Sequence, residues 1–265
     1  MCGRYVLVQK VKVIEKRFNV KASDSLEYSP SYNIGIGQKG LVIPSDNPRE
    51  LETMVFGLTP FWSEKKTYFF NARAEGDHNK EDNPEYRGAK GIINKPAFRK
   101  PIRSQRCLVI ADCFIEGPKD IGLDEPYLVY LKNERPFAFA GIWDEWEEKA
   151  TGIKIKSFAI ITVPANGVLQ KINHPRCPVI LKRGDESKWV NEKTALSDIT
   201  SMLKTSDTDL MNAFRISSDI KDISKNNREL LNPVGERLFA ENLMTIQQDL
   251  ELHGMGHYKP KKRNV

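Results

Sequence analysis

Apolar residues occur along this chain mostly in short runs with the alternation and composition of β-strands. Residues 4–8 (RYVLV) alternate, which predicts a first strand. Val11, Ile14 and Phe18 follow at helical spacing and predict a short amphipathic helix. Further runs rich in Val, Ile, Phe and Tyr, separated by Pro, Gly or Asp-Asn clusters, predict strands at 40–44, 53–58, 106–116, 125–131, 136–146 and 156–163.

Helical periodicity returns only near the C-terminus. Within residues 235–253 one helical face holds Leu238, Phe239, Leu243, Ile246 and Leu250. We therefore expect a helical C-terminal part at 182–258 and a basic tail at 259–265. With no repeat and no long linker, the pattern over residues 1–265 predicts one α+β domain, rich in strands and with peripheral helices.

The charge of the chain is mildly basic and unevenly distributed. A net charge of +6 is small for 265 residues, so a nucleic-acid partner would have to meet a local patch. Residues 87–106 offer one, because they hold seven basic residues, no acidic residue and Phe98. A solvated surface segment and a phosphate-binding strip explain this run equally well. The polar, turn-rich residues 76–91 predict a surface loop.

Neither a membrane segment nor a secretion signal is evident. No apolar run reaches the ~18 residues of a membrane span, and charged residues follow the N-terminus closely. We expect a cytoplasmic protein whose four cysteines, Cys2, Cys107, Cys113 and Cys177, are reduced thiols. The spacing of His174 and Cys177 matches zinc ligands only weakly, so we expect no metal.

The N-terminus has an unusual arrangement of functional groups. Cys2 follows the initiator methionine directly, and Arg4 comes two residues later. The small second residue permits removal of Met1, which would leave an α-amine and a thiol on neighbouring carbons. No internal cysteine offers that pair. Taken alone, however, Cys2 is better explained as a small residue at a tolerated position.

Three internal segments change the interpretation of the N-terminus. They are NARAE (71–75), ADCFIEG (111–117) and INHPRCPVIL (172–181). Together with MCGR (1–4) they resemble the SRAP family, the SOS-response-associated peptidases, and they occur in the family's order. Supporting segments are YNIGIGQ (32–38), FGLTPFW (56–62), RCLVIAD (106–112) and FAGIWDEW (139–146). The resemblance covers residues 2–181, and residues 76–94 look longer than is usual in the family.

The resemblance implies a fold, an activity and a catalytic group. SRAP proteins have one β-rich domain with barrel-like antiparallel sheets, bind single-stranded DNA and cross-link themselves to abasic sites. By resemblance, Cys2 forms the cross-link, Asn71 orients it, Glu116 is the acid/base and His174 is the second proton-transfer group. Outside this set of motifs, Asn71 would be explained as a turn residue, Glu116 as a surface charge and His174 as a core histidine.

The resemblance also implies partners. Arg4, Arg73 and Arg176 match positions that hold DNA phosphates. The expected partner is single-stranded or junction DNA with an abasic site. No metal, organic cofactor, membrane or obligate protein partner is expected, and the peptidase label would reflect removal of Met1, with lyase-like and autopeptidase activity as the enzyme class.

A 1,2-aminothiol suits this chemistry on its own terms. An abasic deoxyribose opens to an aldehyde, and an α-amine with a pKa near ~8 is partly neutral at physiological pH. Attack by the amine gives a Schiff base, and the neighbouring thiol then closes a five-membered thiazolidine. Because the second step is intramolecular, good orientation lowers its barrier by about 7–11 kcal/mol. A carboxyl group and an imidazole suit the proton transfers.

Three apolar residues are candidates for contacts with bases. Ile36 lies between two glycines where the family commonly has a proline that wedges into DNA, so it is a candidate wedge. Phe61 and Trp62 are candidates for base stacking, with a core position as the equal alternative. We assign Trp143 and Trp146 to the core.

The neighbours of Glu116 depart from the family pattern. Ile115 and Gly117 stand where the family usually has aromatic residues, so the packing of the glutamate is expected to differ.

Two other functions fit parts of the sequence. Class II glutamine amidotransferases also begin Met-Cys-Gly and use the thiol as nucleophile and the free amine as its base. Arg4 stands where those enzymes usually have an aliphatic residue. A non-enzymatic nucleic-acid binder that uses residues 87–106 is the second alternative, and it would not need Cys2.

Overall fold

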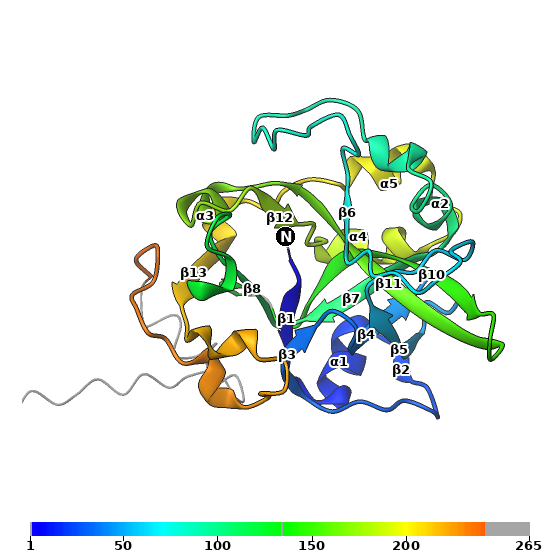
Figure 1. Ribbon diagram of the computed structural model, residues 1–265, viewed down its shortest axis with the longest axis horizontal. Coiled ribbons are helices and arrows are strands. Elements are labelled where there is room, and N and C mark those ends of the chain that lie inside the picture. Colours follow the sequence, from blue (N-terminus) through cyan, green and yellow to red (C-terminus); the bar gives the residue numbers. More distant parts are fainter. Residues whose placement is uncertain (1, 134, 242–265) are drawn as a thin grey trace, which may run out of the picture.

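Five strands of the computed structural model close into a barrel (Figure 1). They are β4 (Lys39–Pro44), β5 (Glu50–Phe56), β7 (Arg106–Ala111), β10 (Phe137–Glu148) and β11 (Ile153–Pro164). Closure occurs at β11, which pairs antiparallel with β10 and parallel with β5. The structure describes residues 2–133 and 135–241.

Three short strands extend the barrel sheet. β2 (Lys21–Ala22) pairs with β5. β6 (Asn71–Arg73) runs parallel to the last part of β11, and β12 (Arg176–Pro178) runs antiparallel to it. Because both short strands pair at the same end of β11, this pairing brings two segments that lie far apart in the sequence close together.

A second sheet holds the N-terminus. Its strand order is β13 (Met211–Arg215), β9 (Tyr127–Leu131), β8 (Cys113–Glu116), β1 (Arg4–Leu7) and β3 (Ser31–Gly35). The predicted first strand is confirmed as β1, which pairs with β3 on one side and β8 on the other. Pairing on both sides fixes the position of the residues just before Arg4.

Helices are short and peripheral. The predicted amphipathic helix is confirmed as α1 (Val11–Phe18), which buries Ile14 and ends at Asn19 in the left-handed conformation that asparagine tolerates. The other α-helices are α2 (Pro101–Ser104), α3 (Gly167–Lys171), α4 (Arg183–Val190) and α5 (Leu196–Ser201). Single 3₁₀ turns are η1 (Gly91–Asn94), η2 (Gly122–Asp124), η3 (Thr208–Leu210), η4 (Ser218–Lys221) and η5 (Arg228–Leu231).

The core explains why the strand predictions hold. The runs at 40–44, 53–58, 125–131, 136–146 and 156–163 all contain strands, and the α+β, β-rich class is confirmed. Aromatic rings fill the space around Tyr5, which packs edge-on against Phe56 and Phe139. Trp143 and Trp146 are buried, as predicted.

The C-terminal part is less helical than the sequence pattern predicts. Residues 182–241 contain α4 and α5 but also strand β13, which pairs with β9. Residues 235–241 are irregular, and Arg237 forms a β-bridge with Phe214 instead of starting a helix. The rest of the expected helix and the basic tail lie outside the described residues. Within the described ranges, no helix combines the length and apolar character that crossing a membrane requires.

Asp112 marks the place where the chain passes from the barrel to the second sheet. The run 106–116, expected as one strand, is two strands, β7 and β8, separated by this residue. Its carboxylate accepts a hydrogen bond from the Val8 N–H at 2.7 Å, which ties the crossing point to the end of β1. Burial raises the pKa of Asp112 to about 6 from an ordinary 3.8.

This raised pKa predicts a pH-dependent stability. The folded chain takes up this proton at a higher pH than the unfolded chain. The contribution of Asp112 to the free energy of unfolding therefore grows as the pH falls and disappears as the pH rises through about 6. When the pH is lowered from about 7 to about 4.5, we expect the free energy of unfolding of the wild-type protein to rise by about 2 kcal/mol relative to that of Asp112→Asn. Urea unfolding of both proteins at the two pH values measures it. If the free energies of unfolding of the two proteins change equally between these pH values, Asp112 is not the group responsible.

Candidate functional site

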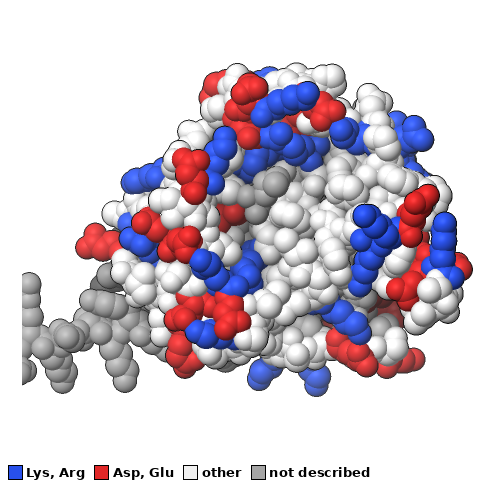
Figure 2. Space-filling model, viewed as in Figure 1, with Lys and Arg blue, Asp and Glu red and all other residues white. Residues whose placement is uncertain are grey.

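A cavity of about 870 Å³ opens where β1 and β8 approach β6 and β12. Its lining includes Arg4, Arg73, Glu116, His174 and Arg176, so residues from all four motifs of the sequence meet there. In Figure 1 the N-terminal end of β1 lies at the centre of the view, beside β6 and β12. Figure 2 shows the same face hollowed at this place, with basic side chains above and below the hollow.

Cys2 lies two residues before the start of β1 and is fully buried. Its Sγ is 3.8 Å from the carbonyl oxygen of Arg4. Burial raises the pKa of the Cys2 thiol well above its ordinary value, and the nearby Glu116 carboxylate raises it further. The thiol is therefore protonated at neutral pH, and a base has to accept its proton before sulfur can act as a nucleophile.

Asn71 begins β6 and holds the backbone of Cys2. The amide nitrogen of its side chain donates to the Cys2 carbonyl at 3.0 Å and to the Phe70 carbonyl at 2.9 Å. Its Oδ1 is buried and accepts no hydrogen bond from the described residues. An unused acceptor next to Cys2 suits a donor such as the α-amine that removal of Met1 would create.

Glu116 and His174 form a buried pair at the bottom of the site. Their side chains are each 5% exposed, and Glu116 Oε2 lies 3.4 Å from His174 Nε2. His174 Nδ1 lies 2.7 Å from the carbonyl oxygen of Gly117, which can only accept, so Nδ1 carries the proton. Burial lowers the pKa of His174 despite the opposing effect of Glu116, so the neutral imidazole presents Nε2 as an acceptor. Nε2 faces the Glu116 carboxyl group, so a proton can pass between the two groups.

Gly117 explains the departure from the family pattern around Glu116. A side chain at this position would lie 1.8 Å from the carbonyl oxygen of Gly122. The connection between β8 and β9 therefore packs against the backbone of Gly117, leaving no room for an aromatic residue. Ile115 is buried in the smaller hydrophobic cluster of the second sheet.

Arg73 and Arg176 lie on either side of the Asp82 carboxylate, which the sequence did not indicate as part of the site. Arg176 is buried, and its guanidinium makes two parallel bonds of 2.8 Å to the Glu75 carboxylate. Burial alone would raise the pKa of Glu75, but Arg176 lowers it below its ordinary value. Asp82 Oδ1 lies 3.3 Å from Arg176 Nη1 and also pairs with Arg73 Nη2. Arg176, which is expected to hold a DNA phosphate, is thus part of the cavity wall and is paired with Glu75 and Asp82.

Comparison with known proteins gives the family. The sequence profile of the SOS response associated peptidase (SRAP) family matches residues 1–223. The chain belongs to the SRAP family. Abasic site processing protein YoqW of Bacillus subtilis (strain 168) is 34% identical over 238 residues, which span 87% of this chain and 99% of that protein. Abasic site processing protein YoaM of the same organism is 35% identical over 239 residues, or 88% of this chain and 98% of that protein.

Solved structures show the same fold. The crystal structure of a protein from Bacteroides thetaiotaomicron superposes with a TM-score of 0.70 at 28% identity and covers 82% of this chain and 93% of that chain. The SRAP assignment agrees with the resemblance seen in the sequence motifs. It also agrees with the closed barrel described above.

Arg4 of this SRAP protein points to the rim of the cavity. Its guanidinium donates to Asn33 Oδ1 at 2.8 Å and to the Lys221 carbonyl at 2.7 Å. Partial burial lowers its pKa from the ordinary value, although arginine remains charged at neutral pH. Ile36 lines the same rim and is partly exposed, as is Ile223 from the C-terminal segment. The sequence did not indicate Ile223, because an isolated isoleucine among polar residues gives no signal.

Phe61 and Trp62 lie on the connection between β5 and β6, outside the cavity lining. They are 53% and 52% exposed, which excludes the core alternative. Lys100 Nζ lies 4.5 Å from the centre of the Phe61 ring. Tyr68 and Phe69 are also exposed on this connection, and the sequence did not indicate them.

The last residue of the basic run at 87–106 does not lie on the surface of this SRAP protein. Arg106 is buried and donates to the last carbonyls of α2 and α4, through Ile102, Trp189 and Asn191 among others. Such carbonyls lack partners within a helix, which explains the buried guanidinium. Arg103 also donates to backbone carbonyls. Arg106 is therefore not part of a phosphate strip, whereas Arg87, Arg99 and Lys100 are exposed.

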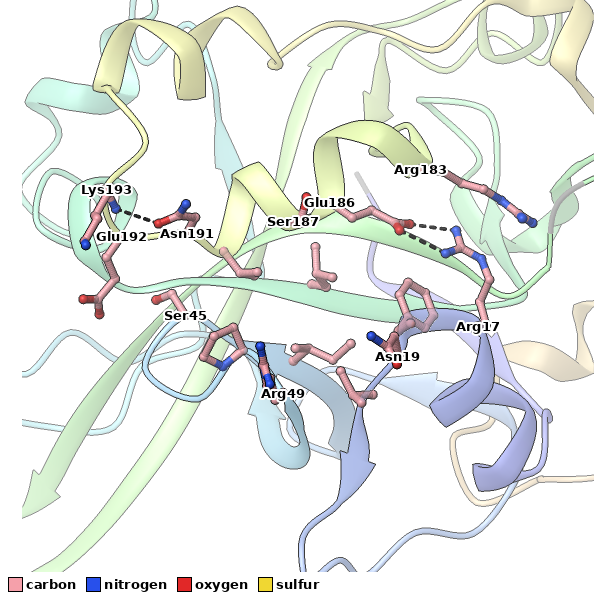
Figure 3. A pocket seen from close by; sticks show the side chains of 16 residues that line it. Arg17, Asn19, Ser45, Arg49, Arg183, Glu186, Ser187, Asn191, Glu192 and Lys193 are labelled. Atoms are coloured by element: carbon pink, nitrogen blue, oxygen red, sulfur yellow. Dashed lines mark hydrogen bonds and ion pairs between the residues drawn. The ribbon is translucent and has the colours of Figure 1, made fainter.

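A second cavity of about 700 Å³ lies between α1 and α4 and shares no lining residue with the first. Figure 3 shows Arg17 and Glu186 across it, joined by two bonds of 2.8 Å and 3.0 Å. None of the candidate site residues lines this cavity. All four cysteines are buried, and over the described part of the chain no three His, Cys, Asp or Glu residues are grouped as metal ligands.

Proposed function

We propose that this protein binds single-stranded DNA and traps abasic sites covalently through Cys2, in a DNA-damage response. The observation that supports it best is the meeting of four residues at one cavity whose rim is basic. Glu116 and His174 line the cavity, and Cys2 and Asn71, which are joined by a hydrogen bond, adjoin the lining residues Gly3 and Phe70. The relatives named abasic site processing proteins support the same substrate. A buried acid–base pair beside an N-terminal aminothiol meets the needs of aldehyde capture.

The first step joins the amine to the opened sugar. Removal of Met1, which we also propose for this chain, frees the α-amine of Cys2, and Asn71 Oδ1 is available to accept a hydrogen bond from it. The nitrogen attacks the aldehyde carbon, and the C–N bond forms as the carbonyl oxygen takes up a proton. Loss of water then gives the Schiff base. The Glu116–His174 pair acts as the proton donor for the departing hydroxyl group.

The second step closes the ring. The Cys2 thiol adds to the imine carbon, forming the C–S bond, while the imine nitrogen gains a proton. Because burial keeps the thiol protonated, Glu116 has to accept its proton as sulfur attacks. The balance over both steps is the loss of one water molecule, with no oxidant, reductant or cofactor. The product is a thiazolidine, which is stable to denaturation.

The decisive experiment is a gel assay. The purified protein is incubated with single-stranded DNA that contains one abasic site and then separated by denaturing electrophoresis. We expect a protein–DNA band that survives denaturation and is absent with undamaged DNA. Absence of this band with protein whose Met1 has been removed would overturn the proposal.

DNA contacts are proposed for two kinds of residues, and salt dependence distinguishes them. Arg73→Ala removes a phosphate contact and should flatten the log–log salt dependence of single-strand binding by about 0.7. Trp62→Ala should weaken binding by about 1–3 kcal/mol and leave the slope unchanged, because stacking involves no counterion release. Fluorescence anisotropy over a salt series measures both.

Arg99→Ala is the matched control, since Arg99 is an exposed arginine of the basic run. A slope that changes with Arg99→Ala and not with Arg73→Ala would place the DNA on residues 87–106 instead.

A further inference from the structure

Residues 76–91 form a loop whose two ends touch. A Cβ on Gly76 would lie 2.9 Å from the backbone of Gly91, and Gly76 has a left-handed φ of 60°. Within the loop, Asn79 holds a turn by bonding both the N–H and the carbonyl of Asn83. A compact loop with adjacent ends is an Ω-loop, which can move as a unit about its ends. In Figure 1 this loop projects at the top of the view.

This loop places one carboxylate oxygen between two guanidinium groups. Asp82 Oδ1 pairs with Arg73 of β6 and, at 3.3 Å, with Arg176 of β12. The two strands lie at the same end of β11, so the slot between the arginines belongs to the rigid barrel, whereas Asp82 belongs to the loop. The Asp82 side chain is 15% exposed and lines the cavity that holds Glu116 and His174.

We propose that Asp82 is an internal substitute for a DNA phosphate and that residues 77–90 are a strap which the DNA backbone displaces. The inference rests on the proposed function, since it names what controls entry to that site. A phosphodiester oxygen has the charge and acceptor geometry of a carboxylate oxygen, so it can replace Asp82 between Arg73 and Arg176. Glu75 stays on the far side of Arg176 and keeps its guanidinium in place.

The strap makes entry selective. In the free protein Asp82 neutralises the arginines, which disfavours neutral ligands and weakly held anions at the site. A DNA strand gains entry only by offering an oxyanion at this position, so apparent affinity is reduced by the fraction of protein whose strap is closed. A DNA strand meets this requirement because it is a polyanion. Its other contacts with the protein hold the strand while one phosphate replaces Asp82.

Substitution of Asp82 tests the strap. Asp82 has a left-handed φ of 56°, which asparagine and glycine tolerate, so Asp82→Asn and Asp82→Gly remove the charge without straining the backbone. In a Cys2→Ala background, both variants should bind undamaged single-stranded DNA about tenfold more tightly than the protein with Asp82. This factor corresponds to an equilibrium in which the closed strap is favoured about ten to one over the open strap. Glu81→Gln is the matched control, an equal charge change at the exposed neighbouring residue, and should change affinity by less than about twofold.

A second measurement needs no DNA. Amide hydrogen exchange over residues 77–90 should be faster in Asp82→Asn than in Glu81→Gln, because the strap opens more often. Equal DNA affinity in the Asp82 and Glu81 variants, or equal exchange, would overturn the strap. If wild-type protein forms no adduct with abasic DNA and the Asp82 variants still bind undamaged strands more tightly, the strap stands and the covalent chemistry fails. If wild-type protein forms the adduct and the Asp82 variants match Glu81→Gln, the chemistry stands and the strap fails.

Discussion

Cys2→Ala is expected to abolish the denaturation-resistant adduct with abasic DNA. The variant keeps an α-amine, so a Schiff base can still form, but no thiol is present to close the ring. An intramolecular second step is worth about 7–11 kcal/mol of barrier, and its loss leaves only a reversible imine. Denaturing electrophoresis with and without borohydride measures the difference, because the reductant fixes an imine and is not needed for a thiazolidine.

Two further proteins separate the amine from the thiol. An N-terminal extension that keeps a peptide bond on the Cys2 nitrogen should prevent both the imine and the adduct while leaving the thiol intact. Cys113→Ala removes a different buried thiol in the same sheet and should cross-link normally. A normal adduct in the extended protein would show that the amine plays no part, and the thiazolidine mechanism would be wrong.

Glu116→Gln is expected to slow adduct formation by about 10²-fold or more, the usual scale for loss of a general acid or base. The amide cannot accept the proton of the buried Cys2 thiol, whose pKa is raised well above its ordinary value. It has nearly the size of the carboxyl group, so the packing against His174 is retained. Single-turnover rates with abasic DNA measure the effect, and affinity for undamaged DNA should stay close to that of the wild type.

His174→Ala should cause a rate loss of similar size, because it removes the second proton-transfer group, which faces Glu116. Asp120→Asn is the control, since Asp120 is exposed on the connection between β8 and β9 and the substitution removes the same charge as Glu116→Gln. Wild-type rates in both Glu116→Gln and His174→Ala would assign this pair to structure alone.

Glu116 and His174 show how much of the site could be predicted. Both were found from the sequence because they lie in motifs that resemble the family, not because their surroundings could be calculated. Their 3.4 Å separation depends on β8 and on the turn after α3, which come from different parts of the chain. The tautomer of His174 depends on the carbonyl of Gly117, another contact that no local pattern reports.

Arg106 shows where a charge pattern misleads. A run of basic residues predicts a solvated face or a phosphate strip, because a charge is usually exposed. Arg106 instead satisfies helix-end carbonyls, and Arg176, which lies outside this run, is paired with Glu75 inside the wall of the cavity. Whether an arginine meets water, a carbonyl or a carboxylate is decided by elements distant in sequence.

The sequence alone determined the strand-rich class, the position of β1 and the place of Cys2 directly after Met1, since alternation and covalent neighbours are local properties of the chain. Only the tertiary structure decided that residues 235–241 are irregular, that β7 and β8 separate at Asp112 and that Asp82 lies between Arg73 and Arg176. The physical reason is the range of the interactions. Backbone periodicity is set by residues a few positions apart, whereas the partner of a buried charge is set by strand pairing between distant segments, here β6 and β12 along β11.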